Sequence, residues 1–328
     1  MGGIAIASDE LQVTVNPLVG GTITQVTHLG SGLSVLGKVP WHPVDAPITR
    51  LAARDEAEWL TRFTGGWPLL FPNGGDACTV GGTFHGFHGE ASIAPWDFSA
   101  VGNSIRLRRR FFSVPVDMER EIVVERDLVI VRERLWMDGT QPVEVMWGHH
   151  ATFGSDLLTG PVEITTGAKR VTVDGGYDPS ANALVPGSQG DWPMVMGKAG
   201  PADLSKPVGP LAAMAYMHDF DRGWATIRRL DNSLTVTLSW DAKQFPCAWL
   251  WYELQGTMEA PWYGRGAMVG IEPSTTKSGA GINAAKQSGA QLITLLPGKE
   301  IRTELQLHVI NLRGKAGEAA PQARAVVR

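Results

Sequence analysis

Residues 120–136 read REIVVERDLVIVRERLW. Two apolar runs rich in valine and isoleucine flank Arg126–Asp127, a pattern typical of two antiparallel strands joined by a tight turn. Similar short runs recur along the chain, separated by glycine, proline, aspartate and asparagine. Further strands are expected at Leu11–Val15, Ser104–Phe111, Val143–Trp147, Val162–Thr165, Val171–Val173, Trp224–Arg228, Ser233–Trp240, Ala248–Glu253, Gln291–Leu295 and Ile301–Ile310.

Helical periodicity is scarce, and Leu51–Arg62 is the one segment with a helix-like pattern. Many short strands without crossover helices predict an all-β fold, an antiparallel sandwich or barrel. Because strand signals fill the length, we expect one large domain over residues 1–312 and a flexible tail over 313–328. The segment Tyr177–Gly209 is rich in Gly, Pro and Ser, and we expect a long loop near the mouth of a site.

The composition limits which binding partners and which cellular compartment are expected. The 328 residues are 43% hydrophobic and 19% charged, which is typical of a folded globular protein. A formal net charge of −4 argues against nucleic acid as a partner. The sequence contains no apolar run of about 18 residues, the length that a membrane-spanning helix needs. The N-terminus does not resemble a signal peptide. We therefore expect a cytoplasmic protein, with Cys78 and Cys247 as buried thiols.

The first two segments that concentrate polar chemistry lie before residue 91. Residues 64–75 read TGGWPLLFPNGG, and they lack the strand–loop–helix context of a phosphate-binding loop. Residues 84–90 read FHGFHGE, which places His85 and His88 together in a glycine-rich loop. A buried turn and strand explain the first segment equally well, whereas the paired histidines point towards a site.

Two later segments add a histidine pair and a carboxylate. Residues 146–153 read MWGHHATF, and successive side chains of a strand point to opposite faces. One of His149 and His150 therefore faces a common site with His88, and the other is structural. Residues 268–275 read MVGIEPST, which places Glu272 after an apolar run, at the end of a predicted strand. Partial desolvation there raises the pKa of Glu272 and makes it a competent base.

The histidines and the glutamate fit two kinds of chemistry. Together they are typical ligands of a divalent metal, and they are also the side chains of metal-free general acid–base catalysis. The spacing contains neither His-x-His nor His-Glu-x-x-His, so it favours neither interpretation.

In this order, the four segments resemble those of the aldose 1-epimerase family, the galactose mutarotase-like proteins, and especially its divergent bacterial branch. Gly65–Pro72 is similar to the family's GGIPLLFP stretch, and His85–Phe87 matches its His-Gly-Phe. His150–Phe153 is similar to its His-x-Tyr-Phe, with Thr152 in the place of tyrosine. Gly270–Pro273 resembles the segment that carries the family's catalytic glutamate. The resemblance implies a large antiparallel β-supersandwich.

The resemblance also implies roles for individual residues. Glu272 accepts the proton of the anomeric hydroxyl and His150 protonates the ring oxygen, so that the ring opens, rotates about C1–C2 and closes as the other anomer. This cycle needs no metal and no other cofactor. The family's earlier histidine falls on His88 or His85, and the distance to Pro95–Trp96 favours His88. The remaining candidates for substrate contacts are His85, Arg62, Asn73, Trp67 and Asp219.

The expected function is therefore that of an aldose mutarotase acting on a free, possibly acidic, sugar as a monomer or homodimer. A metal-dependent lyase or isomerase on the same scaffold is one alternative, and a non-catalytic sugar-binding protein is the other. A phosphorylated or sulfonated sugar needs a cationic pocket. Arg62 and Arg265 are the candidates for one, but no arginine cluster lies beside the motifs.

Overall fold

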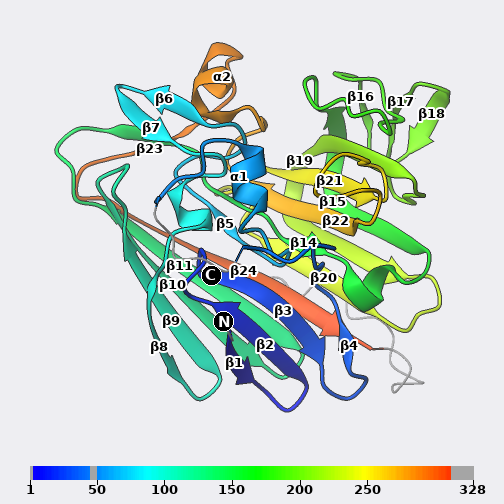
Figure 1. Cartoon of the computed structure of the whole chain (residues 1–328), viewed down its shortest axis with the longest axis horizontal. Coiled ribbons are helices and arrows are strands. Elements are labelled where there is room, and N and C mark those ends of the chain that lie inside the picture. Colours follow the sequence, from blue (N-terminus) through cyan, green and yellow to red (C-terminus); the bar gives the residue numbers. More distant parts are fainter. Residues whose placement is uncertain (1–2, 45–49, 312–328) are drawn as a thin grey trace.

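The computed structural model describes residues 3–44 and 50–311 and is built mainly of antiparallel strands (Figure 1). The hairpin predicted from residues 120–136 is present as β10 (Val116–Glu125) and β11 (Leu128–Met137). Glu125 pairs with Leu128, and Arg126 takes a left-handed φ of 51° in the turn between them. β9 (Ser104–Arg110) and β8 (Asp97–Val101) extend this hairpin to the edge of the sheet.

Within the described ranges, fourteen strands form one large sheet. Its main path runs β5 (Leu69–Leu70), β13 (Gly148–His149), β22 (Ala267–Ser274), β21 (Cys247–Leu254), β19 (Leu211–Arg229), β20 (Thr235–Trp240), β24 (Glu300–Ile310), β11, β10, β9 and β8. Off this path, β14 (Thr152–Phe153) pairs with β22, and β15 (Val162–Val173) pairs with β19 and with β16 (Gln189–Asp191). The all-β prediction is confirmed.

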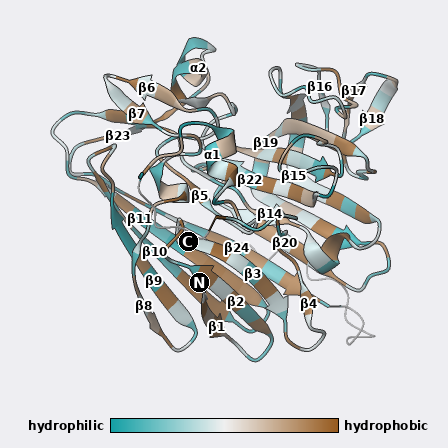
Figure 2. Cartoon of the chain, viewed as in Figure 1, coloured by the Kyte–Doolittle hydropathy of each residue, from teal (hydrophilic) through white to brown (hydrophobic). Residues whose placement is uncertain are grey.

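A second sheet covers part of the first and encloses the main core. It is formed by β1 (Ile4–Ala7), β2 (Leu11–Asn16), β3 (Thr22–His28) and β4 (Leu33–Ser34). Every second residue of β2, such as Val13 and Val15, is fully buried in one apolar cluster with Ile122 and Val124 of β10. The same alternation of apolar and polar residues is visible along the strands in Figure 2. Burial of one face of each sheet is the main driving force for this arrangement.

Smaller elements surround the two sheets. They are β6 (Cys78–Val80), β7 (Thr83–His85), β12 (Val143–Val145), β23 (Ile293–Leu295), β17 (Met194–Gly197), β18 (Gly200–Asp203), α1 (Glu56–Leu60), α2 (Gly281–Gln287) and the 3₁₀ turns η1 (Glu90–Ser92) and η2 (Ser155–Leu158). The segment predicted as a long loop, Tyr177–Gly209, thus contains β16, β17 and β18. The two strands predicted between residues 162 and 173 are one strand, β15, with a register shift at Gly167.

The predicted helix over Leu51–Arg62 is real but short. Only residues 56–60 are helical, and the helix begins after Asp55, whose side chain caps it by accepting a 2.8 Å hydrogen bond from the Glu58 amide. The helix buries Trp59 and Leu60 against the sheet. None of the described helices has the length and apolarity of a membrane span. Both cysteines are free thiols; Cys247 is buried as predicted, whereas Cys78 is only half-buried. The predicted tail lies outside the described residues.

Candidate active site

Glu272 lies inside β22 and not at the end of a strand, since Pro273 and Ser274 continue the pairing with β21. It stands opposite Trp249 of β21, which in turn contacts Tyr216 of β19 in the same row of the sheet. Residues in register across antiparallel strands share a face. Glu272, Trp249 and Tyr216 therefore project from one face, and this face carries α1 and the loops described below.

Gly270 makes room for the carboxyl group of Glu272. Residues two apart on a strand lie on the same face, and a β-carbon at position 270 would come within 2.2 Å of Glu272 Oε1 and 3.1 Å of the Trp251 β-carbon. The carboxyl group thus lies back along its own strand beside Trp251. A side chain at position 270 would displace it.

His150 is the histidine that faces Glu272. Its Nε2 lies 3.7 Å from Glu272 Oε1, and its Nδ1 is hydrogen bonded at 2.8 Å to the hydroxyl of Thr152. The Thr152 side chain is fully buried, so this contact fixes the orientation of the imidazole ring. His149 points to the opposite side, into the core, as strand alternation predicts. Of the two nitrogens of His150, Nε2 is the one presented to a ligand.

His88 completes the group from the glycine-rich loop. Its ring centroid is 5.3 Å from that of His150, and its Nδ1 accepts a 2.9 Å hydrogen bond from the Gly75 amide. Since Nδ1 is the acceptor, neutral His88 carries its proton on Nε2 and can donate it in a hydrogen bond. Gly75 has a φ of 77°, and a β-carbon there would lie 1.6 Å from Gly279 O. Only glycine therefore permits this contact.

Aromatic rings surround the two histidines. Trp59, Phe63 and Trp251 have ring centroids 5.6, 5.4 and 5.7 Å from that of His150. Trp59 and Phe87 lie 4.7 and 4.2 Å from the ring of His88. Flat apolar side chains of this kind exclude water and can stack on the apolar face of a sugar ring. The polar groups of the site consequently work in a dry environment.

Burial shifts the ionisation of all three polar residues. Glu272 is 2% exposed and its Oε1 accepts no hydrogen bond in the described chain, so burial raises its pKa well above the ordinary value. Burial lowers the pKa of His150 to about 4. The pKa of His88 is lowered well below its usual range by burial and, secondarily, by His150. A carboxylate made more basic thus lies beside imidazoles that are neutral at pH 7.

His85 lies away from this group, although it belongs to the same loop. Burial lowers its pKa and the nearby Glu90 opposes that shift. Glu90 is itself bound by Arg109 and by the amides of Phe112 and Ser113. The structure brings His88, and not His85, to His150.

Asn73 and Trp67 have structural surroundings. Both polar ends of the Asn73 amide are satisfied by backbone, with Nδ2 donating to Asp76 O at 2.8 Å and Gly86 O at 2.9 Å and Oδ1 accepting from the Ile282 amide at 3.0 Å. Asn73 thereby ties together the loops that hold His88. Trp67 is fully buried in the main core, where its Nε1 donates to His149 Nδ1 at 3.2 Å.

The two remaining candidates for substrate contacts are further out. Arg62 follows α1, donates to Val44 O at 3.5 Å and lines a small hollow that also includes Trp59. Asp219 is exposed at a bend within β19, where its φ is 59°, and it contacts His218 Nδ1 at 3.2 Å. The structure does not bring Asp219 to Glu272.

The aromatic walls were missed in the sequence. One signal for them exists in residues 248–252, AWLWY, where Trp249 and Trp251 are two apart on a strand and share the face of Glu272. Trp59 and Phe63 carry no such signal, because Trp59 comes from a helix of only five residues and Phe63 lies beyond its end.

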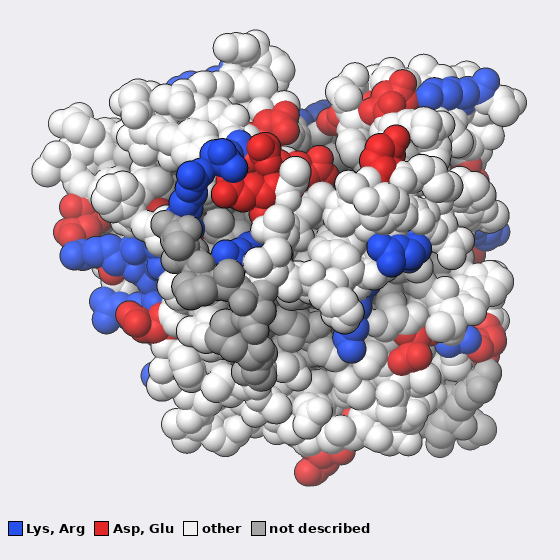
Figure 3. All heavy atoms as spheres, in the orientation of Figure 1, with Lys and Arg blue, Asp and Glu red and all other residues white. Residues whose placement is uncertain are grey.

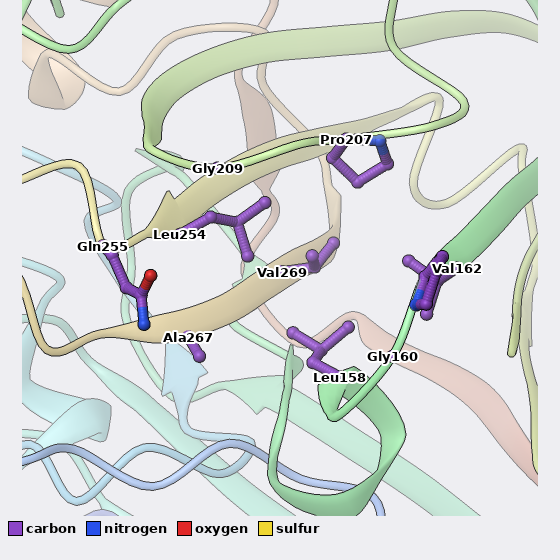
Figure 4. Close-up of a pocket in the computed structure, with 10 residues that line it drawn as sticks. Leu158, Gly160, Val162, Pro207, Gly209, Leu254, Gln255, Ala267 and Val269 are labelled. Atoms are coloured by element: carbon purple, nitrogen blue, oxygen red, sulfur yellow. The ribbon is translucent and has the colours of Figure 1, made fainter.

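Two further observations concern where else in the described residues a metal ion or a ligand could bind. The described residues contain no group of three or more His, Cys, Asp or Glu arranged to hold a metal ion. A cavity of about 200 Å³ opens on the other face of β22, where it is lined by Ala267 and Val269 together with Leu158, Leu254 and Gln255 (Figure 4). No titratable side chain lines that cavity.

Comparisons with known proteins agree with the fold. A family model described as "Domain of unknown function (DUF4432)" matches residues 4–309, and no curated protein matches the chain. A putative aldose 1-epimerase from Klebsiella pneumoniae superposes with a TM-score of 0.69 at 16% identity, covering 93% of this chain and 78% of the other. A galactose mutarotase-like protein from Lactobacillus casei gives 0.66 at 16% identity, with 94% and 100% covered. A putative aldose 1-epimerase from Escherichia coli K12 gives 0.65 at 15% identity, with 94% and 98% covered. The chain thus has the galactose mutarotase-like fold.

Proposed function

The chain belongs to the DUF4432 family, and we propose that it is a mutarotase that interconverts the α and β anomers of a free aldose. One observation carries the proposal: His150 Nε2 lies 3.7 Å from Glu272 Oε1, an oxygen without a hydrogen-bond donor in the described chain. A buried acid–base pair whose carboxyl oxygen lacks a hydrogen-bond donor is suited to moving protons on a bound ligand. The fold supports the choice of a sugar as that ligand.

Glu272 and His150 act as one unit that holds a single proton. Burial disfavours the charged form of each group, which favours the arrangement with the proton on Glu272 until a sugar binds. The reactive form has the proton on His150 and a carboxylate at Glu272. Sugar hydroxyl groups that donate hydrogen bonds to the carboxylate favour this form.

From the reactive form the reaction needs two proton transfers. The Glu272 carboxylate takes the proton of the anomeric hydroxyl while His150 gives its proton to the ring oxygen. The bond between C1 and the ring oxygen breaks, and C1 becomes an aldehyde. Rotation about C1–C2 followed by the reverse transfers produces the other anomer, and the pair regains its starting protonation.

His88 and the aromatic rings hold the sugar during this cycle. The Nε2–H of His88 donates a hydrogen bond to a sugar oxygen, because its Nδ1 is committed to Gly75. Trp59 and Trp251 flank the ring of His150 and offer apolar surfaces for stacking. Exclusion of water by these rings strengthens the interactions of the acid and the base with the substrate.

The test is anomer exchange. Purified protein is added to freshly dissolved α-anomers of a panel of aldoses and sugar acids, and the approach to equilibrium is followed by polarimetry or NMR. We expect acceleration for at least one sugar, and the same rate after treatment with a chelator. Absence of acceleration across the panel would contradict the proposal, and loss of the rate on chelation would favour a metal-dependent isomerase.

A further inference from the structure

Three carboxylates lie close together on the face of the molecule that carries α1. Asp76 is desolvated and repelled by Asp174, and both effects raise its pKa. Glu56, in the first turn of α1, is desolvated and repelled by Asp76, which likewise raises its pKa. Figure 3 shows acidic side chains gathered on this face, where Figure 1 places α1. The side chains of Glu56 and Asp76 are exposed to solvent.

These carboxylates border the candidate active site. Glu56 is one helical turn before Trp59, whose ring is 5.6 Å from that of His150. Burial raises the pKa of Tyr177, Glu56 adds to this shift and Trp251 opposes it, so Tyr177 lies near both residues. Since Trp59 and Trp251 are two walls of the site, Glu56 lies where these walls end.

Asp174 connects Glu56 and Asp76, here called the carboxylate rim, to the face of the sheet that carries Glu272. It accepts a hydrogen bond from the hydroxyl of Tyr216, and Tyr216 stands in the same row of the sheet as Trp249 and Glu272. Its other oxygen accepts the amides of Gly176 and Tyr177 at 2.7 and 2.6 Å. Asp174 is thus fully used in holding this edge, whereas Glu56 and Asp76 have no hydrogen bond or ion pair through their carboxylates within the described ranges.

Among the described residues, no cation acts on the pKa of Glu56 or Asp76, and the arginines that precede α1, Arg50 and Arg54, pair with Glu58. Burial alone sets the pKa of Glu272, and none of the described lysines or arginines shifts the pKa of His150 or His88. The guanidinium of Arg265 donates to the backbone oxygens of Trp262 and Pro261. An anionic group on a ligand would be placed among carboxylates, which costs binding free energy, whereas hydroxyl groups would find strong acceptors.

We infer that the site takes an uncharged aldose, whose hydroxyl groups remote from C1 donate hydrogen bonds to Glu56 and Asp76, and that it discriminates against sugars bearing phosphate, sulfate or carboxylate. The inference rests on the proposed function in placing C1 beside the unpartnered, buried Oε1 of Glu272. The carboxylate rim then meets the far end of the sugar ring, which is where an aldose 6-phosphate carries its charge.

The experiment compares binding of glucose, galactose and mannose with binding of their 6-phosphates and uronic acids, using the tryptophan fluorescence of the full chain. We expect binding of an uncharged sugar and affinities about tenfold or more weaker for its charged derivatives. The difference should shrink as salt is raised, because salt screens charges that are exposed to solvent. Tighter binding of a charged derivative, or no binding of any uncharged sugar, would overturn the inference.

Anomer exchange measured on the same samples keeps the two proposals apart. An uncharged sugar that binds without exchange contradicts the mutarotase and leaves the inference on substrate class standing. A charged sugar that is exchanged in preference contradicts the substrate class and leaves the mutarotase standing.

Substitutions of Glu56 and Asp76 test whether these residues cause the discrimination against charged sugars. In Glu56→Gln/Asp76→Asn, the preference for uncharged sugar over 6-phosphate should fall about tenfold, and both side chains are exposed, so the fold should persist. The matched control is Glu125→Gln, an exposed carboxylate at the far end of β10 that should leave the preference unchanged. An unchanged preference in the double variant would overturn the assignment of the rim.

Discussion

Two buried carboxylates, Glu133 and Glu272, each lie beside one of two adjacent histidines, and they differ in their other partners and in the direction of their pKa shifts. Glu133 is paired with Arg120 at 3.0 Å and accepts a hydrogen bond from Trp147 Nε1 at 3.1 Å, and His149 Nε2 lies 3.3 Å away. Although burial opposes it, these partners lower the pKa of Glu133. Glu272 is as deeply buried, but its nearest charged partner is His150 at 3.7 Å and its pKa is raised.

The difference separates a structural carboxylate from a reactive one. Strand alternation points His149 into the core and His150 to the opposite face, so one short segment supplies a histidine to each carboxylate. A buried charge with a counter-ion, such as Glu133 beside Arg120, organises the core, and removing one partner leaves the other uncompensated. An unpaired buried carboxyl costs stability and persists where a ligand supplies the missing contacts. The predictions below test whether the two sites divide in this way.

The largest effect is expected on catalysis at Glu272. Glu272→Gln should reduce anomer exchange by about 10²–10⁴-fold, because the general base is lost while the shape is kept. Stability should stay constant or rise, since a buried ionisable group is removed. The measurement is the exchange rate by NMR, together with the melting temperature. An unchanged exchange rate would remove Glu272 from the mechanism.

The next effect concerns the stability of the core. Glu133→Gln should lower the free energy of unfolding by about 3–5 kcal/mol, because Arg120 is left without its counter-charge in a dry environment. Exchange per folded molecule should be retained. Urea unfolding measures the loss, and the matched control is Glu121→Gln, a half-buried carboxylate of β10 whose partners, Arg106 and Arg132, are exposed to solvent. A loss no larger than that of the control would refute the distinction between the two carboxylates.

The pH dependence of stability should have opposite signs at the two sites. The folded pKa of Glu272 is raised, so its contribution falls as pH rises from about 4.5 towards that raised value. The folded pKa of Glu133 is lowered, so its contribution is present above about 4.5 and is lost as pH falls through the lowered value. His150, with a pKa lowered to about 4, costs stability as pH falls from about 6.5 towards 4.

Unfolding measured from pH 4 to 8 checks these signs. The stability gained by Glu272→Gln relative to the native chain should grow with pH above about 4.5. The stability lost by Glu133→Gln should instead shrink at the acid end. Parallel curves for the two variants would show that neither carboxyl has the ionisation proposed for it.

The smallest effect is expected at Thr152, which positions His150. Thr152→Val removes the hydrogen bond to His150 Nδ1 and should slow exchange about fivefold, the value of one ordinary hydrogen bond. The acid limb of the pH–rate profile should shift as well, which a purely structural role would not cause. Thr152→Ser, which keeps the hydroxyl, should restore both. A valine variant with native rate and profile would deny the positioning role.

The sequence predicts local features of this molecule better than long-range ones. The hairpin at residues 120–136 and the opposite facing of His149 and His150 follow from alternation alone. Glu272 was wrongly placed at a strand end because a proline follows it. The amides of Ile271 and Thr275 donate to Ala151 and Trp147, and Pro273 lies between them where no donor is required.

The surroundings of the site depend on contacts that no local pattern encodes. Trp59 comes from a five-residue helix and Trp251 from a strand nearly two hundred residues later, and only the fold places both against His150. For the same reason Asn73 and Trp67 were assigned to a ligand although backbone and core contacts account for them. The acidic rim joins three segments, so it was missed entirely.

The most direct test measures anomer exchange and unfolding on the same samples of Glu272→Gln and Glu133→Gln, with the native chain as reference and an aldose that the native chain exchanges. Glu272→Gln should lose exchange and keep its stability, whereas Glu133→Gln should lose stability and keep exchange per folded molecule. A Glu272→Gln protein that exchanges anomers at the native rate while fully folded would contradict the assignment of Glu272 as the catalytic base.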